Sequence, residues 1–116
     1  MASEITLNLP TPISVNATRR IDWRNHARTK EWLRQADALF LTQKRGLPPP
    51  ITGPFEIAIT LQNGSQIDAD NALKLLIDFV RRVRLVTDDS PRFMKRITVE
   101  FGDVEGCRVV IRPFSA

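Results

Sequence analysis

Two aspartates, an asparagine and a lysine lie close together in the run Asp68-Ala69-Asp70-Asn71-Ala72-Leu73-Lys74. A second acidic pair, Asp88-Asp89, follows further along the chain. Magnesium prefers oxygen ligands, and proteins usually hold it with one or a few carboxylates together with a substrate phosphate. Such a metal polarises the phosphoryl group and generates hydroxide near neutral pH. The ammonium group of Lys74 could stabilise the charge that develops on the phosphate. These residue types point to metal-dependent chemistry on a phosphate.

The same acidic residues also have an ordinary structural interpretation. Asp70 can be a helix N-cap and Asp68 a turn residue. Asp70 and Lys74 can form an exposed ion pair between residues four apart, which is worth roughly 0.3–0.5 kcal/mol. The run Asp88-Asp89-Ser90-Pro91 can be a solvated turn. Spacing alone favours this structural interpretation by roughly two to one, because carboxylates commonly cap helices and form turns.

The charge distribution favours a polyanionic partner with a local cation. The chain of 116 residues carries a net charge of +4, and 13 of its 17 basic residues are arginine. Arginine binds phosphate oxygens in a bidentate manner, so this excess fits a nucleic acid. Residues 51–70 carry three acids and no base, whereas residues 1–50 and 71–116 are each basic. An acidic segment inside a basic protein suits a protein that holds a cation against a phosphate.

The elements that must position these residues can be predicted from hydrophobic periodicity. Alternation of apolar and polar residues predicts four strands, and helical spacing predicts two helices. The strands are expected at residues 4–9, 54–61, 95–101 and 107–112, and the helices at 29–45 and 69–83. Residues 10–28 are expected to form an irregular basic loop, and residues 102–106 a hairpin connection. The expected fold class is α+β: one domain over residues 1–116, with a small mixed β-sheet, two helices on one face and the order β-α-β-α-β-β.

The acidic motif resembles the signature of RusA-type Holliday-junction resolvases. The resemblance is carried by Asp68-x-Asp70-Asn71-x-x-Lys74 followed by Asp88-Asp89-Ser90. The early segment Pro12-Ile13-Ser14-Val15-Asn16 is similar to a segment of that family, with isoleucine in place of a second proline. The resemblance covers most of the chain but is weak outside residues 67–90. Two features depart from the family: residues 62–66 lack a basic run, and Ala69 replaces a bulkier apolar residue.

The resemblance implies a metal-dependent endonuclease that acts as a homodimer and cuts four-way DNA junctions by paired, symmetric nicks in recombination and repair. Mg²⁺ is the implied cofactor, and Mn²⁺ is the alternative. Carried over residue by residue, Asp68, Asp70 and Asp89 would bind the metal. Lys74 would be the catalytic or phosphate-contacting lysine. Asp88 is a supporting candidate, and Asp78 is a further residue that could support the site or the dimer.

Several polar and basic residues are candidates for contact with DNA. Asn16, Arg19, Arg20 and Arg24 fall in the expected basic loop, and solvent exposure is an equally good explanation for them. Arg81 and Arg82 end the second helix, where cations complement the helix dipole by default. Lys74 joins the DNA-binding set through the resemblance.

Other functional classes find little support in the sequence. No apolar run approaches the length of a membrane span, and no secretory signal is recognisable. The single cysteine, Cys107, excludes an internal disulfide, and no glycine-rich phosphate loop is present. We therefore expect no organic cofactor, no membrane contact and a cytoplasmic location, for a protein encoded by a bacterium or a phage. The main alternative is a non-catalytic basic module of the same fold that recognises branched DNA. A third interpretation is a small metal-binding structural protein unconnected with DNA.

Overall fold

The computed structural model describes residues 4–12, 23–64, 69–88 and 90–114. Within these ranges the chain forms four strands, two α-helices and a short 3-10 helix. Their bounds are β1 Ile5–Leu9, α1 Trp23–Gln43, η1 Lys44–Gly46, β2 Phe55–Gln62, α2 Ala69–Arg82, β3 Met94–Gly102 and β4 Cys107–Pro113. In these ranges no helix combines the length and the apolar character that crossing a membrane requires.

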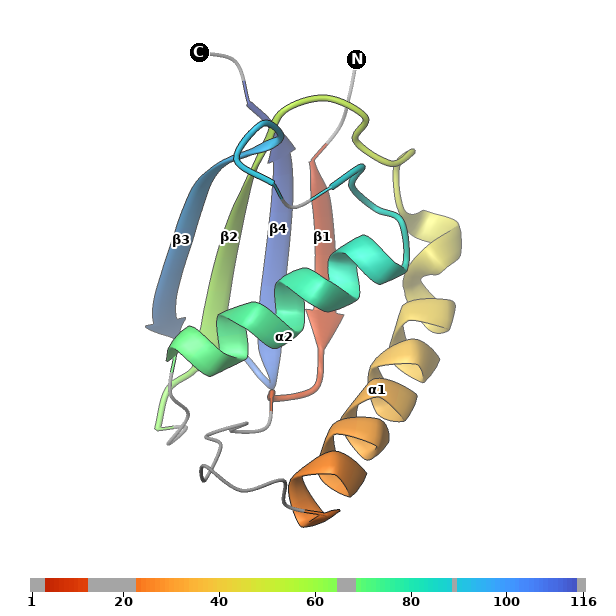
Figure 1. The fold of residues 1–116 in the computed structure, drawn as a ribbon, viewed down its shortest axis with the longest axis vertical. Helices are drawn as coiled ribbons and strands as arrows, with labels where there is room; N and C mark the ends of the chain where they lie inside the picture. Colours follow the sequence, from red (N-terminus) through yellow and green to blue (C-terminus); the bar gives the residue numbers. More distant parts are fainter. Residues whose placement is uncertain (1–3, 13–22, 65–68, 89, 115–116) are drawn as a thin grey trace.

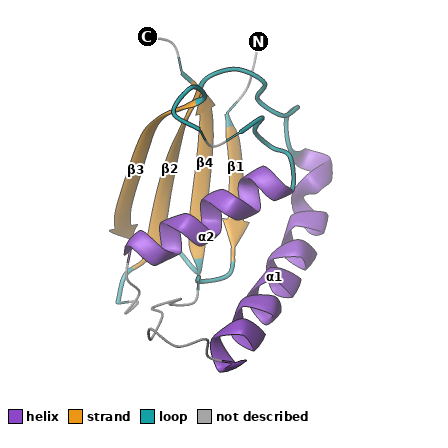
Figure 2. Ribbon diagram, viewed as in Figure 1, coloured by secondary structure: helices purple, strands orange, loops and turns teal. Residues whose placement is uncertain are grey.

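The four strands form one mixed sheet in the order β1-β4-β2-β3. Strand β4 is antiparallel to both of its neighbours, and β3 is parallel to β2. Helix α2 crosses one face of the sheet, and α1 lies alongside β1 (Figures 1 and 2). The α+β class, with a mixed four-stranded sheet and two helices, is thereby confirmed.

Two local predictions are wrong. The expected hairpin between the last two strands does not form, because β2 lies between β3 and β4 in the sheet. The connection at residues 102–106 instead passes the end of β2, where the N–H of Asn63 donates to the carbonyl of Gly102. Helix α1 begins at Trp23, inside the segment expected to be an irregular loop. No proline or glycine interrupts residues 23–43, so the helix extends towards the N-terminus beyond its apolar stripe.

One layer of apolar side chains joins the helices to the sheet. Alternate residues of β1, β2 and β4 are buried, which is the pattern of strands with one covered face. On the helix side, Phe79 of α2 makes edge-to-face contacts with Trp32 and Phe40 of α1, with ring centroids 5.6 and 6.2 Å apart. Phe79 therefore holds the two helices together over the sheet.

The end of α1 is tied to β1 by polar contacts. The side-chain amide of Gln43 donates to the carbonyl of Asn8 (2.8 Å) and accepts from its N–H (2.9 Å). The indole N–H of Trp32 donates to the carbonyl of Pro10. These contacts satisfy backbone groups at the outer edge of β1, so α1 covers that edge of the sheet.

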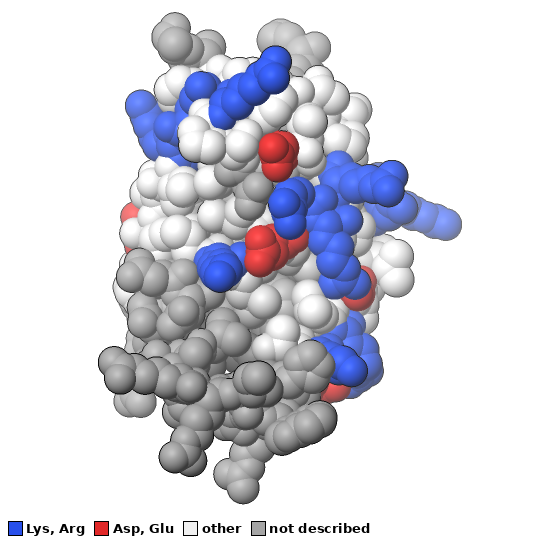
Figure 3. Space-filling view, in the orientation of Figure 1, with Lys and Arg blue, Asp and Glu red and all other residues white. Residues whose placement is uncertain are grey.

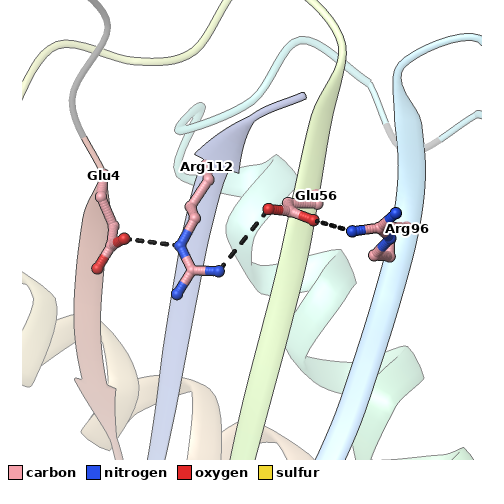
Figure 4. A network of polar contacts seen from close by, with 4 residues as sticks. All are labelled: Glu4, Glu56, Arg96 and Arg112. Atoms are coloured by element: carbon pink, nitrogen blue, oxygen red, sulfur yellow. Dashed lines mark hydrogen bonds and ion pairs between the residues drawn. The ribbon is translucent and has the colours of Figure 1, made fainter. Parts of the chain in front are cut away.

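The sheet face opposite the helices carries an ion-pair network across all four strands (Figure 4). Arg112 contacts Glu4 (2.6 Å) and Glu56 (3.7 Å), and Glu56 also contacts Arg96 (3.3 Å). The pKa of Arg112 is raised mainly by its hydrogen bond with Glu4, and the carboxylate of Glu56 contributes as well. Alternating charges on neighbouring strands stabilise the pairing of the sheet.

Candidate metal and nucleic-acid site

The acidic motif coincides with the beginning of α2. Asp70 is the second residue of the helix, and Lys74 and Asp78 follow at intervals of four, so the three positions share one helical row. Lys74 and Asp78 are exposed. The opposite row of α2, which includes Leu76 and Phe79, is buried against the sheet and α1. The amphipathic character of the helix therefore directs the row of Lys74 towards solvent.

Part of the expected metal site lies outside the described residues. Asp68 and Asp89 are outside them, and so is the side chain of Asp70. Asp88 is described and half-buried. It belongs to a loop that follows α2 and that is fastened to the beginning of β2. The N–H of Ile51 donates to the carbonyl of Leu85 (2.9 Å), and the N–H of Phe55 donates to the carbonyl of Phe93 (2.8 Å).

The beginning of α2 and the loop of Asp88 lie at opposite ends of the sheet (Figure 1). Helix α2 follows the end of β2, whereas the loop of Asp88 is bonded to residues at and before its beginning. The eight residues of β2 span roughly 25 Å at about 3.3 Å per residue. The 14 residues of α2 cover about 20 Å at 1.5 Å per residue. The structure therefore does not bring the position of Asp70 and Asp88 together within one chain.

A metal ion needs several oxygen ligands at once. The separation therefore determines whether Asp88 and Asp70 of one chain can bind the same ion. Among the described residues, no group of three histidine, cysteine or acidic side chains lies close enough to hold an ion. The chemistry of the predicted donor set fits Mg²⁺, because it consists of carboxylates. Of the predicted acids, Asp88 is the one whose side chain is described, and within one chain it lies at the opposite end of α2 from the position of Asp70.

Basic side chains gather on the helix side of the molecule, with a few acids between them (Figure 3). Arg81, Arg82 and Arg84 are exposed at and just beyond the end of α2. Arg82 forms an ion pair with Asp37 of α1 (2.8 Å), so part of its charge is already balanced. The backbone of Arg84 has a φ of +63°, which turns the chain sharply after the helix.

Helix α1 adds exposed basic residues to those predicted from the sequence. Lys30, Arg34, Lys44 and Arg45 are exposed on or just after this helix. The i,i+4 spacing of Lys30 and Arg34 was the available signal, since it places both on one helical face. Arg34 also pairs with Glu31, and the hydrogen bond from Arg34 lowers the pKa of Glu31 to about 2.

The remaining candidates for DNA contact precede or begin α1 in the sequence. Asn16, Arg19 and Arg20 lie outside the described residues. Arg24 belongs to the first turns of α1, and its side chain is outside the described set.

Cys107 is fully buried, and burial raises the pKa of its thiol to about 12. It is a core residue and not a nucleophile, as the alternation in its strand predicts.

In comparisons with known proteins, no family model matches this chain and no curated protein matches it. The residues themselves and their positions in the fold are therefore what indicates a function.

Proposed function

We propose that this protein is a Mg²⁺-dependent endonuclease that cuts four-way DNA junctions, similar to the RusA-type resolvases. The observation that carries the proposal is the helical row on α2, in which the position of Asp70 at the helix entrance is followed one turn later by the exposed Lys74. Lys74 belongs to α2, which covers the same side of the sheet as the exposed basic residues of α1 and α2. A phosphodiester backbone bound on this side of the protein would meet positive charge near the helix that carries the motif.

The proposal assigns a role to each residue. When bound, Mg²⁺ would activate water for in-line attack on a phosphodiester. Asp68 and Asp70, together with Asp89 and its neighbour Asp88, would hold the ion. Lys74 would contact the phosphate and balance the charge that develops on it. The leaving group would be the 3′ oxygen, which leaves 5′-phosphate and 3′-hydroxyl ends.

The geometry adds a requirement to this proposal. Because one chain holds Asp88 far from the entrance of α2, a site that contains both must combine two chains. The proposed enzyme is therefore a homodimer in which the entrance of α2 from one copy meets the Asp88 loop of the other. Two such sites, related by a two-fold axis, would match the near two-fold symmetry of a four-way junction.

The test is cleavage of an end-labelled synthetic four-way junction on a denaturing gel, beside a linear duplex of the same sequence. The wild-type protein should make paired nicks on opposed strands of the junction in Mg²⁺ and none in EDTA. Asp70→Asn should lose this cleavage and keep or strengthen binding to the junction, because it removes a ligand and a negative charge. Glu31→Gln is the matched control, since it removes one acid from the exposed face of α1, away from the motif. Full cleavage by Asp70→Asn would refute the assignment.

The separation of Asp88 from the position of Asp70 within one chain favours one alternative function. A basic module that binds branched DNA without cutting it needs no cluster of carboxylates. That function predicts a junction that shifts on a native gel, with an affinity that falls steeply with salt, and stays uncut at every Mg²⁺ concentration. Such a result would demote the acids of the motif to helix caps and turn residues.

A further inference from the structure

Strand β3 is an open edge of the sheet with apolar side chains left uncovered. It pairs with β2 on one side only, and its register places Ile97, Val99 and Phe101 beside Ile57, Ile59 and Leu61. The three β2 side chains are buried under the helices, whereas Ile97 is 42% and Phe101 48% exposed. The helices therefore cover β3 less completely than β2: Val99 is half-buried against the core, whereas Ile97 and Phe101 on the same face are exposed.

An edge of this kind is a surface for pairing with another strand. Among the described strands none pairs with the outer edge of β3, and edge strands with exposed apolar side chains recruit other chains unless they are protected. The opposite edge, β1, is covered by α1 and by the contacts of Gln43. The nine residues of β3 make it the longest strand described, so the open edge is also the longest.

We propose that β3 is the dimer interface of this protein, with the β3 strands of two copies paired antiparallel about Val99. In this register Ile97 lies opposite Phe101 of the second copy, and Val99 lies opposite its own counterpart. Lys95 lies opposite Asp103 of the second copy, which places opposite charges together. Glu100 faces Thr98, so no like charges meet. A register centred on Thr98 would instead set Phe101 against Lys95.

Two-fold antiparallel pairing has a consequence for the acidic residues. It sets the beginning of β3 in one copy beside the end of β3 in the other. Asp88 and Ser90 precede the beginning of β3, and Ser90 is hydrogen-bonded to Phe93 and Met94. The end of β3 pairs with Gln62, the last residue of β2, and α2 begins shortly after. The interface therefore brings the Asp88 loop of one copy to the end of the partner sheet where α2 begins. This last step rests on the proposed function, whereas the interface itself rests on β3.

The first experiment is the oligomeric state, measured by sedimentation equilibrium. The wild-type protein should be a dimer at micromolar concentration. Phe101→Arg should raise the dissociation constant by roughly thirtyfold or more, as expected for a central apolar interface residue. Leu41→Arg is the matched control, because Leu41 on α1 is 67% exposed and lies outside the proposed interface. A monomeric wild-type protein, or equal dimerisation of both variants, would overturn the proposal.

A second variant keeps the test decisive if Phe101→Arg fails to fold. Val99→Cys places two thiols across the two-fold axis, within reach of a disulfide. Mild oxidation should link this variant into dimers and leave Leu41→Cys monomeric on a non-reducing gel. The native thiol of Cys107 is buried and does not compete. Equal cross-linking of the two variants would refute the proposed register.

Cleavage assays separate the failure of this inference from the failure of the proposed function. A dimer linked through Val99→Cys that leaves junctions uncut would support the interface and refute the nuclease. The opposite outcome combines three results: the protein cleaves junctions, Phe101→Arg still dimerises, and Val99→Cys forms no disulfide-linked dimer. It would support the nuclease and refute the interface.

Discussion

Gly106, at the beginning of β4, should be the glycine least tolerant of a side chain. Its φ is +70°, and a Cβ atom there would lie 2.5 Å from the carbonyl oxygen of Leu9. The obstacle is backbone and cannot rotate away. The left-handed conformation costs a non-glycine residue roughly 1–2 kcal/mol, and relieving the clash adds about 1–3 kcal/mol of overpacking strain. Gly106→Ala should thus lower the free energy of unfolding by about 3 kcal/mol.

Two other glycines provide matched controls for this prediction. Gly64 also has a positive φ, +81°, but has no atom within 4 Å of an added Cβ. Gly64→Ala should therefore cost only the conformational part, about 1–2 kcal/mol. Gly53 has neither a positive φ nor a close neighbour, so Gly53→Ala should change stability by less than about 0.5 kcal/mol or increase it.

Urea unfolding followed by far-ultraviolet circular dichroism measures all three differences. The slopes should stay constant while the midpoints fall in the order Gly53→Ala, Gly64→Ala, Gly106→Ala. In a thermal scan, each kilocalorie should lower the melting temperature by roughly 4 °C. If Gly106→Ala and Gly64→Ala agree within about 0.5 kcal/mol, the close approach of β4 to Leu9 does not constrain the fold and the reasoning is refuted.

Three further predictions use other parts of the structure. Phe79→Ala should lower the free energy of unfolding by about 3–5 kcal/mol in urea, because it removes the ring that joins α2 to α1; a loss below 1 kcal/mol would contradict this role. Folding raises the pKa of the Cys107 thiol from 9.0 to about 12. Above pH 9 the thiol ionises in the unfolded chain but not in the folded one, so the free energy of unfolding should fall as the pH rises from 9 towards 12. Native protein at pH 8 should leave a thiol reagent unreacted until urea unfolds it, and rapid labelling would disprove this burial. Asp37→Asn should release Arg82 from its ion pair and tighten junction binding, with the slope of log affinity against log salt steeper by about one; an unchanged slope would place Arg82 away from the DNA.

Local patterns were sufficient to predict most elements but not their pairing. The alternation in β2 and β4 and the apolar stripe of α2 follow from side-chain periodicity, which is a local property. The predicted hairpin is wrong because strands that are adjacent in sequence need not be adjacent in the sheet. The pairing of β4 with β1 and β2 depends on residues far apart in the chain, such as Ile5 with Ile111. No local signal encodes that choice.

The same limit applies to the candidate site. The motif identifies acidic residues of the right type, and their spacing places Asp70 and Lys74 on one row of α2. Spacing cannot show that the helix itself separates Asp70 from Asp88 by its full length. That separation is set by where the loop after α2 is fastened, which is a tertiary contact between Ile51 and Leu85.

The central position of β4 also has a consequence for how the protein folds. This strand lies between β1 and β2 in the sheet, yet it follows all the other described elements along the chain. A nascent chain that has completed β3 still has a gap in the middle of its sheet, flanked by two unsatisfied strands. Pairing β4 with β1 closes a loop that spans most of the chain, and the entropy of closure is lost before the stabilising contacts form. Folding should therefore be slow for a domain of this size. During synthesis the apolar faces of β1 and β2 stay accessible until β4 arrives, which makes this interval the period of greatest aggregation risk.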